Sequence, residues 1–150
     1  MKDDVDDLHQ MLNKMGQAYY TNNRMLNIIL NDKLKKAVQE EIAVDVKIGN
    51  ISLDGMKDVD ITTIFANLLD NALEAAAQAE GEKFIKIQAE RFHDFHIIKM
   101  INAKGQGCKK EGHMGIGLEN VRNALKKYEG TMEIKEEKET YRIVITIPQV

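Results

Sequence analysis

The spacing of apolar residues divides the chain into helical and extended segments. Four segments carry an apolar residue every three or four positions, the spacing of one buried helix face. They are residues 5–19, 26–38, 59–79 and 116–128. Thr21 or Asn22 is the expected N-cap of the second helix, and Gly130 is the expected C-cap of the last.

In the other patterned segments, apolar residues alternate with polar ones, which is typical of strands with one buried face. These are residues 42–48, 85–89, 98–102, 132–134 and 141–147. The sequences RFHDFH and KEEKE are each predicted to close a hairpin. The order helix–helix–strand–helix–strand–strand–helix–strand–strand predicts an α+β fold. We expect a two-layer α/β sandwich, with helices on one face of a mixed sheet of about five strands.

The first helix has a pattern of its own. Its apolar residues recur at a spacing near 3.5 residues and are Val5, Leu8, Leu12, Met15 and Tyr19. This pattern is either the seam of a coiled coil or a face packed on the same domain, and both interpretations stay open. The seam stops near residues 16–23, the only weak domain boundary in a chain whose 150 residues otherwise suit one domain.

Composition and charge indicate the compartment and the class of protein. No apolar run is long enough to cross a bilayer, and the acidic start MKDDVDDLHQ has no signal-peptide core. The single cysteine, Cys108, suits a reducing compartment, so we expect a cytoplasmic domain. The net charge of −3, with both signs interspersed, gives no reason to expect nucleic acid.

Two asparagines stand out in the third helix, in the stretch NLLDNALEAA. Asn67 and Asn71 lie one turn apart on a face separate from the apolar stripe, together with Glu74 and Gln78. A solvated face would explain them, but such faces usually carry Glu, Lys, Gln or Arg, which favour helix more than Asn does. An amide oxygen is also a suitable ligand for Mg²⁺ that is shared with phosphates.

Glycines gather just before the last helix. Residues 103–115, AKGQGCKKEGHMG, form a long polar loop, and loops of this length are usually functional or disordered. Gly112, Gly115 and Gly117 could let backbone N–H groups approach an anion at the helix N-terminus, or could simply serve the turns of a flexible loop. Neither a Walker A loop nor a strand-borne G-x-G-x-x-G is present.

Together these stretches resemble a known family. NLLDNALEA followed by GHMGIGL resembles the N box and second glycine box of the GHKL (Bergerat-fold) ATPases. The closer resemblance is to the catalytic domain of sensor histidine kinases, and TNNRMLNIILNDKLKKA resembles the segment that precedes it in the AgrC-like quorum-sensing subgroup. The resemblance implies that residues 1–20 end a dimerisation or linker helix and that residues 21–150 form the ATP-binding domain.

The resemblance also implies a site, in which ATP and Mg²⁺ lie between the asparagine helix and a lid formed by residues 103–117. Asn71 matches the family's Mg²⁺ ligand, and Asn67 lines the phosphate side. Gly112, Gly115, Gly117 and Leu118 match the turn around the phosphates. Asn102 stands where most relatives carry an aspartate that accepts a hydrogen bond from the adenine amino group. Lys104, with Lys109 and Lys110, could approach the γ-phosphate.

Two departures from the family pattern are visible. The D-x-G-x-G box is replaced by NAKGQG, so the base would meet the neutral amide of Asn102, with a bond weaker by ~1 kcal/mol. The G-T-x-F motif before the last strand is replaced by ETYRIVITIP. ATP affinity is therefore expected to be low.

The phosphoacceptor is expected to lie outside this chain. His9 is the only histidine on a suitable helix, but Gln10 follows it where the family has an acidic residue. The resemblance implies transfer to a histidine on a dimerisation helix of the parent kinase, a response regulator downstream, a homodimeric parent, and membrane contact only through other parent segments. Metal sites at Cys108 with His113, or at His93 with His96, lack a four-ligand set.

Two alternatives remain. A degenerate GHKL domain could bind nucleotide weakly or not at all and act as a dimerisation or partner-binding module, as the neutral Asn102 suggests. An anti-sigma-factor-type serine kinase of the same superfamily is the other, although the TNNRMLNIILNDK segment and the heptad pattern fit a dimerisation helix better.

Overall fold

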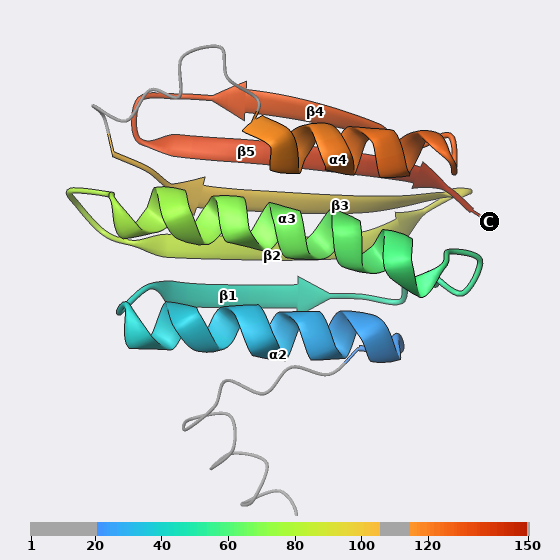
Figure 1. Ribbon diagram of the computed structural model, residues 1–150, viewed down its shortest axis with the longest axis horizontal. Helices are drawn as coiled ribbons and strands as arrows, with labels where there is room; N and C mark the ends of the chain where they lie inside the picture. The colour runs from blue at the N-terminus through green and yellow to red at the C-terminus, as the bar shows by residue number, and fades with distance from the viewer. Residues whose placement is uncertain (1–20, 106–114, 150) are drawn as a thin grey trace, which may run out of the picture.

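Three helices cover one face of a five-stranded sheet in the computed structural model, which describes residues 21–105 and 115–149 (Figure 1). The helices are α2 (Arg24–Gln39), α3 (Asp58–Ala77) and α4 (Gly115–Lys126). Their apolar stripes face the sheet, and the opposite face of the sheet has no helix of the described residues upon it (Figure 1). The predicted α+β, two-layer architecture is confirmed.

The sheet is mixed, as expected. Its strands are β1 (Ala43–Ile48), β2 (Phe84–Phe92), β3 (Phe95–Ala103), β4 (Thr131–Glu136) and β5 (Thr140–Pro148). They lie in the order β1-β2-β3-β5-β4, with β1 parallel to β2 and every other neighbouring pair antiparallel. Parallel neighbours need a long crossover, and α3 supplies it between β1 and β2.

Alternation along the strands builds the core. Every second residue of the three central strands turns toward the helices and is buried: Ile85, Ile87, Ala89, Ile98, Met100, Ile143, Ile145 and Ile147. The stripe of α3 meets them with Ile61, Ile64, Phe65, Leu68, Leu69, Ala72 and Ala76. Both sets carry the period predicted from the sequence, because each element must bury one face.

The ends of the helices differ from the prediction. Asn23 caps α2, its side-chain oxygen accepting from the Leu26 N–H at 2.8 Å, so the expected caps Thr21 and Asn22 are wrong. The Asn22 amide instead donates to the Ile51 carbonyl at 2.6 Å, which fixes the start of α2 to the loop after β1.

The geometry of the turn after α4 shows why residue 130 is a glycine. Glu129, and not the glycine, adopts the left-handed conformation with φ 58°, while the Gly130 N–H donates to the Leu125 carbonyl at 2.9 Å. A Cβ at Gly130 would lie 3.0 Å from Leu125 Cδ2, so glycine serves close packing here. α4 itself ends at Lys126, and Tyr128 therefore lies in the turn beyond it.

Within residues 21–105 and 115–149, no helix has both the length and the apolar content that crossing a membrane would require. The predicted first helix, Cys108, Lys109, Lys110, Gly112 and His113 lie outside these ranges.

Candidate functional site

Asn67 lies where α3 approaches the beginning of α4. Its amide nitrogen donates to the Thr63 carbonyl one turn earlier, at 2.6 Å. Its oxygen lies against Gly117, where an added Cβ would be only 3.0 Å from Asn67 Oδ1. A larger residue at position 117 would displace the asparagine, so the two predicted motifs meet at a close helix–helix contact.

Asn71 occupies the next turn of α3 and is half-buried. Its side chain makes no hydrogen bond to any of residues 21–105 or 115–149. The Asn71 amide keeps both its oxygen and its nitrogen available to a ligand, whereas the Asn67 nitrogen donates to its own helix and its oxygen packs against Gly117. The two asparagines that the sequence treats alike therefore differ in what they can offer a ligand.

The beginning of α4 provides backbone donors. Gly115, Gly117 and Leu118 lie among the first four residues of the helix, whose N–H groups have no partner within it. The Leu118 side chain is buried, so only its backbone could reach a ligand. Unpaired N–H groups and the positive end of the helix dipole together favour an anion at this position.

Asn102 lies at the end of β3, on the face of the sheet that the helices cover. It is buried, and its amide nitrogen donates to the Ala103 carbonyl at 2.9 Å. That bond occupies one of the amide's donors and turns the group so that its oxygen can act as an acceptor.

Lys104 is held in an ion pair at the start of the loop. Its ammonium lies 3.2 Å from Glu136 Oε2, its side chain is only 7% exposed, and its N–H donates to the Glu139 carbonyl. To reach a phosphate, the side chain would have to leave Glu136. The structure thus places Lys104 against the β4–β5 hairpin, a partner that the sequence pattern did not indicate.

These groups converge on one end of the molecule. The end of β3, the beginning of α4 and the C-terminal end of α3 all lie at the left in Figure 1. Sequence reasoning missed Tyr141 and Glu136 at this end. Their alternation in β4 and β5 was visible, but only the strand register shows that Tyr141 stands beside Asn102 and that Glu136 stands beside Tyr141.

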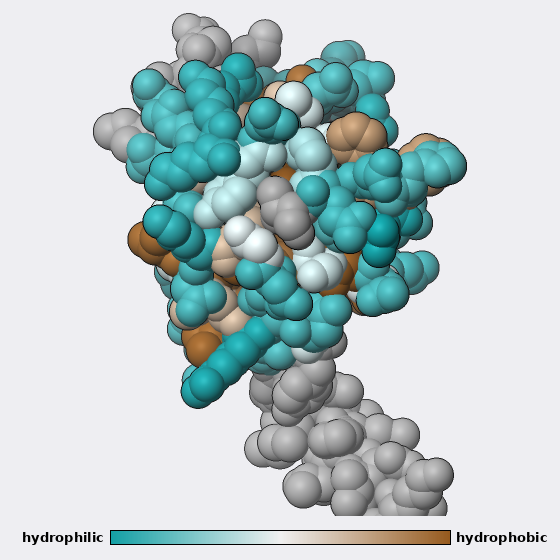
Figure 2. All heavy atoms as spheres, turned by 90° about the vertical axis from the view of Figure 1, so that its right-hand side faces the viewer, coloured by the Kyte–Doolittle hydropathy of each residue, from teal (hydrophilic) through white to brown (hydrophobic). Residues whose placement is uncertain are grey.

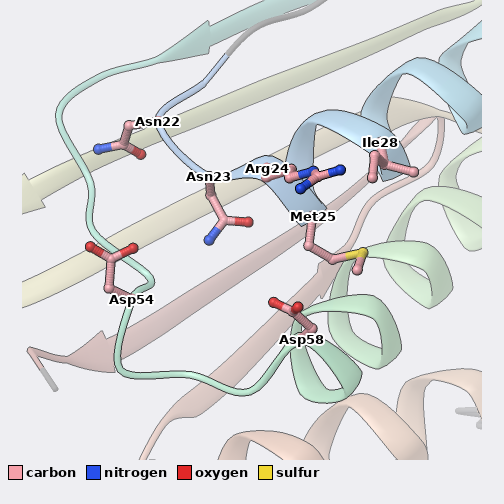
Figure 3. A pocket seen from close by; sticks show the side chains of 7 residues that line it. All are labelled: Asn22, Asn23, Arg24, Met25, Ile28, Asp54 and Asp58. Atoms are coloured by element: carbon pink, nitrogen blue, oxygen red, sulfur yellow. The ribbon is translucent and has the colours of Figure 1, made fainter.

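The other end of the helix layer has different chemistry. A hollow of about 510 Å³ lies between the beginnings of α2 and α3, lined by Asn22, Asn23, Arg24, Met25, Ile28, Asp54 and Asp58 (Figure 3). None of the predicted site residues lines it. Figure 2 shows this end of the molecule as mostly hydrophilic, with scattered hydrophobic residues, and so without the broad apolar surface typical of an interface.

A polar cluster joins α3 to α4 near that end. The buried carboxylate of Asp60 accepts hydrogen bonds from the Tyr128 hydroxyl and from the Lys127 ammonium, the latter at 3.0 Å. The Tyr128 hydroxyl also accepts from the Lys57 N–H at 3.0 Å. The hydrogen bond from Tyr128, followed by Lys127, lowers the pKa of Asp60 against the opposing effect of burial. The cluster fixes the distal ends of both helices.

No group of three or more His, Cys, Asp or Glu side chains suitable for a metal occurs in the part of the chain that the structure describes. An ion held through phosphate oxygens, with one or two protein ligands, needs no such group. A single amide such as Asn71 fits that kind of binding.

Comparison with known families identifies the fold. The sequence profile of the GHKL domain family matches residues 56–148, which include both motifs and most of the sheet. The chain belongs to the GHKL family. Among curated protein sequences, none matches this GHKL domain significantly.

Solved structures share the architecture of this GHKL domain. A nucleotide-free catalytic domain of histidine kinase ThkA has a TM-score of 0.68 at 18% identity, over 87% of this chain and 93% of that one. Histidine kinase AdeS of Acinetobacter baumannii gives 0.67 at 16%, over 97% and 76% of the two chains. The histidine kinase domain of a blue-light activated kinase from Erythrobacter litoralis gives 0.65 at 13%, over 94% and 69%. At these identities the likeness shows a common fold.

Proposed function

We propose that this GHKL domain binds Mg-ATP as the catalytic domain of a sensor histidine kinase. The proposal rests on one observation above all, the contact between Asn67 and Gly117. This contact places the asparagine-bearing face of α3 against the N-terminus of α4, whose first N–H groups have no partner within the helix. Two motifs far apart in the sequence thereby form a single polar corner, of the kind that a metal-bound triphosphate requires.

The phosphate side of the site would be made by α3 and α4. The N–H groups of Gly115, Gly117 and Leu118 would donate to phosphate oxygens, and Asn71 would offer its amide oxygen to the cation. Bound Mg²⁺ would neutralise part of the phosphate charge. Asn67 would act on the phosphate side by holding the glycine turn at the correct distance from Asn71. Gly112, outside the described residues, is proposed to extend the same turn.

The base side would be made by the end of β3. With its amide nitrogen engaged by the Ala103 carbonyl, Asn102 presents an oxygen to the base. That oxygen can accept from the amino group of adenine but not from the carbonyl of guanine. The Asn102 oxygen would therefore favour an amino group as an aspartate does, without the charge and at lower affinity, while the second N–H of the amide stays available as a donor.

In phosphoryl transfer the protein contributes positioning and electrostatics more than covalent chemistry. We propose that the γ-phosphate passes to a histidine on a dimerisation helix outside this chain. Residues 21–150 would be the catalytic domain and residues 1–20 the end of the preceding helix. We further propose that the parent kinase is AgrC-like and homodimeric. This domain would be cytosolic, and a response regulator would act downstream.

Titration calorimetry with Mg-ATP tests the proposal. Wild-type protein should bind weakly, and Asn71→Ala should weaken binding at least about ten-fold, because the cation loses a ligand. Asn123→Ala is the matched control, since Asn123 is an exposed helical asparagine on α4 with no role in the site. Its affinity should equal that of the wild type, and chelating Mg²⁺ should bring the wild type down to the level of Asn71→Ala.

Absence of heat with folded wild-type protein at millimolar ATP would contradict nucleotide binding. It would favour the second candidate, a partner-binding GHKL module, for which the neutral Asn102 is the specific observation. Where binding is found, adding a separately prepared dimerisation helix with labelled ATP tests the kinase step. Acid-labile label on that helix supports histidine transfer, and acid-stable label on serine would point to a serine kinase.

A further inference from the structure

One row of side chains crosses the end of the sheet beside Asn102. In the strand register, Asn102 of β3 stands opposite Ile85 of β2 on one side and opposite Tyr141 of β5 on the other, and Tyr141 stands opposite Glu136 of β4. Tyr141 and Glu136 share the alternation of Ile143 and Ile134, which pack into the core, so the whole row faces the helices.

Within this row, Tyr141 is more exposed than the two residues on its β2 side. Ile85 is 0% exposed and Asn102 2%, whereas the tyrosine ring is only partly buried. β5 begins further to the left than α4 in Figure 1. Tyr141 is thus a partly buried aromatic side chain directly beside the amide that would bind the base.

An ion pair lies on the side of Tyr141 away from Asn102. Glu136 lies across from Tyr141, and the Lys104 ammonium binds its carboxylate at 3.2 Å. Burial, and after it the charge of Glu136, raises the pKa of the Tyr141 hydroxyl, so the ring stays neutral at physiological pH. Lys104 and Glu136 thus stand on one side of the tyrosine in the row, and Asn102 stands on the other.

We propose that Tyr141 contacts the purine base of the nucleotide and supplies affinity that the neutral Asn102 lacks. This inference rests on the proposed function. Side chains directly opposite in an antiparallel pair have Cβ atoms about 5 Å apart. A planar base bonded to one of them is wide enough to lie against the other. Aromatic contact with a base does not depend on a formal charge, so it can compensate for a missing carboxylate.

Calorimetric titrations of Mg-ATP and of magnesium tripolyphosphate, which has no base, separate this role from a structural one. Tyr141→Ala should weaken Mg-ATP binding by about 5- to 100-fold, the range that base–aromatic stacking provides. Binding of tripolyphosphate should stay within about two-fold of wild type, because the phosphate corner is untouched. Tyr141→Phe keeps the ring and should bind Mg-ATP as wild type does.

Two controls address folding. Tyr141→Leu keeps apolar bulk in the core, so it should match the wild type in thermal unfolding and still lose Mg-ATP affinity. Val144→Ala, on the opposite face of β5, should leave both titrations unchanged.

Tyrosine emission gives an independent signal, since the chain has no tryptophan and four tyrosines. ATP should quench part of the tyrosine fluorescence of the wild type, and Tyr141→Phe should lose that response while still binding. Unchanged Mg-ATP affinity in Tyr141→Ala and Tyr141→Leu would overturn this inference and leave the proposed function standing. A wild type that binds tripolyphosphate as tightly as Mg-ATP would also overturn it. A wild type that binds neither would overturn the proposed function and this inference together.

Discussion

Asn67 and Asn71 show how much a residue's neighbours decide. Both replace better helix formers on the same face of α3, and the sequence offers one explanation for the pair. The structure separates them: Asn67 bonds back to its own helix and lies against Gly117, while Asn71 has no partner among residues 21–105 and 115–149. Asn67 thus fixes a helix contact, and Asn71 is the residue that we propose as the ligand of the cation.

The sequence pattern did not predict that the His96 side chain is buried. It lies in β3 opposite Arg91 and Ile147 and is 1% exposed, and neither ring nitrogen has a hydrogen-bond partner among the residues that the structure describes. Burial, and secondarily the charge of Arg91, lowers its pKa below 6.5. A histidine with a lowered pKa destabilises the fold in acid, because the unfolded chain binds its proton more readily.

We expect His96→Leu to raise the free energy of unfolding by about 1–2 kcal/mol at pH 7.5, since it removes two unpaired polar atoms from an apolar site. Wild-type stability should fall as pH drops from 6.5 toward the lowered pKa, and the variant should lose that part of the pH dependence. Urea unfolding at pH 7.5 and 5 measures both effects. His93→Asn is the control, because His93 lies at the exposed hairpin turn in the left-handed conformation, with φ 55°, which asparagine tolerates. A variant less stable than wild type at both pH values would show that the ring packs better than its unpaired nitrogens suggest.

At the scale of elements, α3 and α4 are joined at two places. Close packing of Asn67 on Gly117 fixes the helices near the predicted site, and the hydrogen bonds of Asp60 with Tyr128 and Lys127 fix them at the other end. The sequence placed Tyr128 on the apolar face of the last helix. In the structure it lies past the helix end, where its hydroxyl can reach the first turn of α3.

We expect Tyr128→Phe to lower the free energy of unfolding by about 1.5–3 kcal/mol at pH 7, because a buried carboxylate loses its closest donor. The lowered pKa of Asp60 means that its contribution is present above pH 3.8 and is lost as pH falls through the folded-state pKa. The difference between wild type and Tyr128→Phe should therefore shrink between pH 7 and 3 in urea unfolding. Tyr141→Phe removes a hydroxyl with no such bond and should change stability much less. A constant difference at both pH values would assign the effect to packing.

At the scale of the whole molecule, the question is whether residues 21–150 form a complete domain. The Thr21 hydroxyl donates to Asn27 Oδ1 at 2.8 Å, and Asn23 caps α2. These contacts fix the start of α2. The proposed division into residues 1–20 and 21–150 stays a prediction.

A chain of residues 21–150 should accordingly fold alone. We expect its thermal unfolding midpoint to lie within about 2 °C of the full chain and its Mg-ATP affinity to be unchanged. Differential scanning calorimetry and titration calorimetry test this, and sedimentation would show whether residues 1–20 alter the oligomeric state. A midpoint lowered by several degrees would favour the other interpretation of the heptad pattern, a first helix packed on the domain.

Over the residues that the structure describes, the sequence by itself determined the types of the elements, their order, and the family. These follow from short-range information, since the period of apolar residues identifies helix or strand, and the two motifs are contiguous. Cap positions were less determined, because Thr21, Asn22 and Asn23 are chemically alike as caps and only the path of the chain selects one.

Tertiary structure alone decided which side chains meet. The parallel pairing of β1 and β2, the place of Tyr141 beside Asn102, and the ion pair of Lys104 with Glu136 depend on strand order and register. Burial of His96 depends on the helix layer above it. Such contacts join residues distant in the chain, and their energies come from packing and desolvation, which local spacing does not encode.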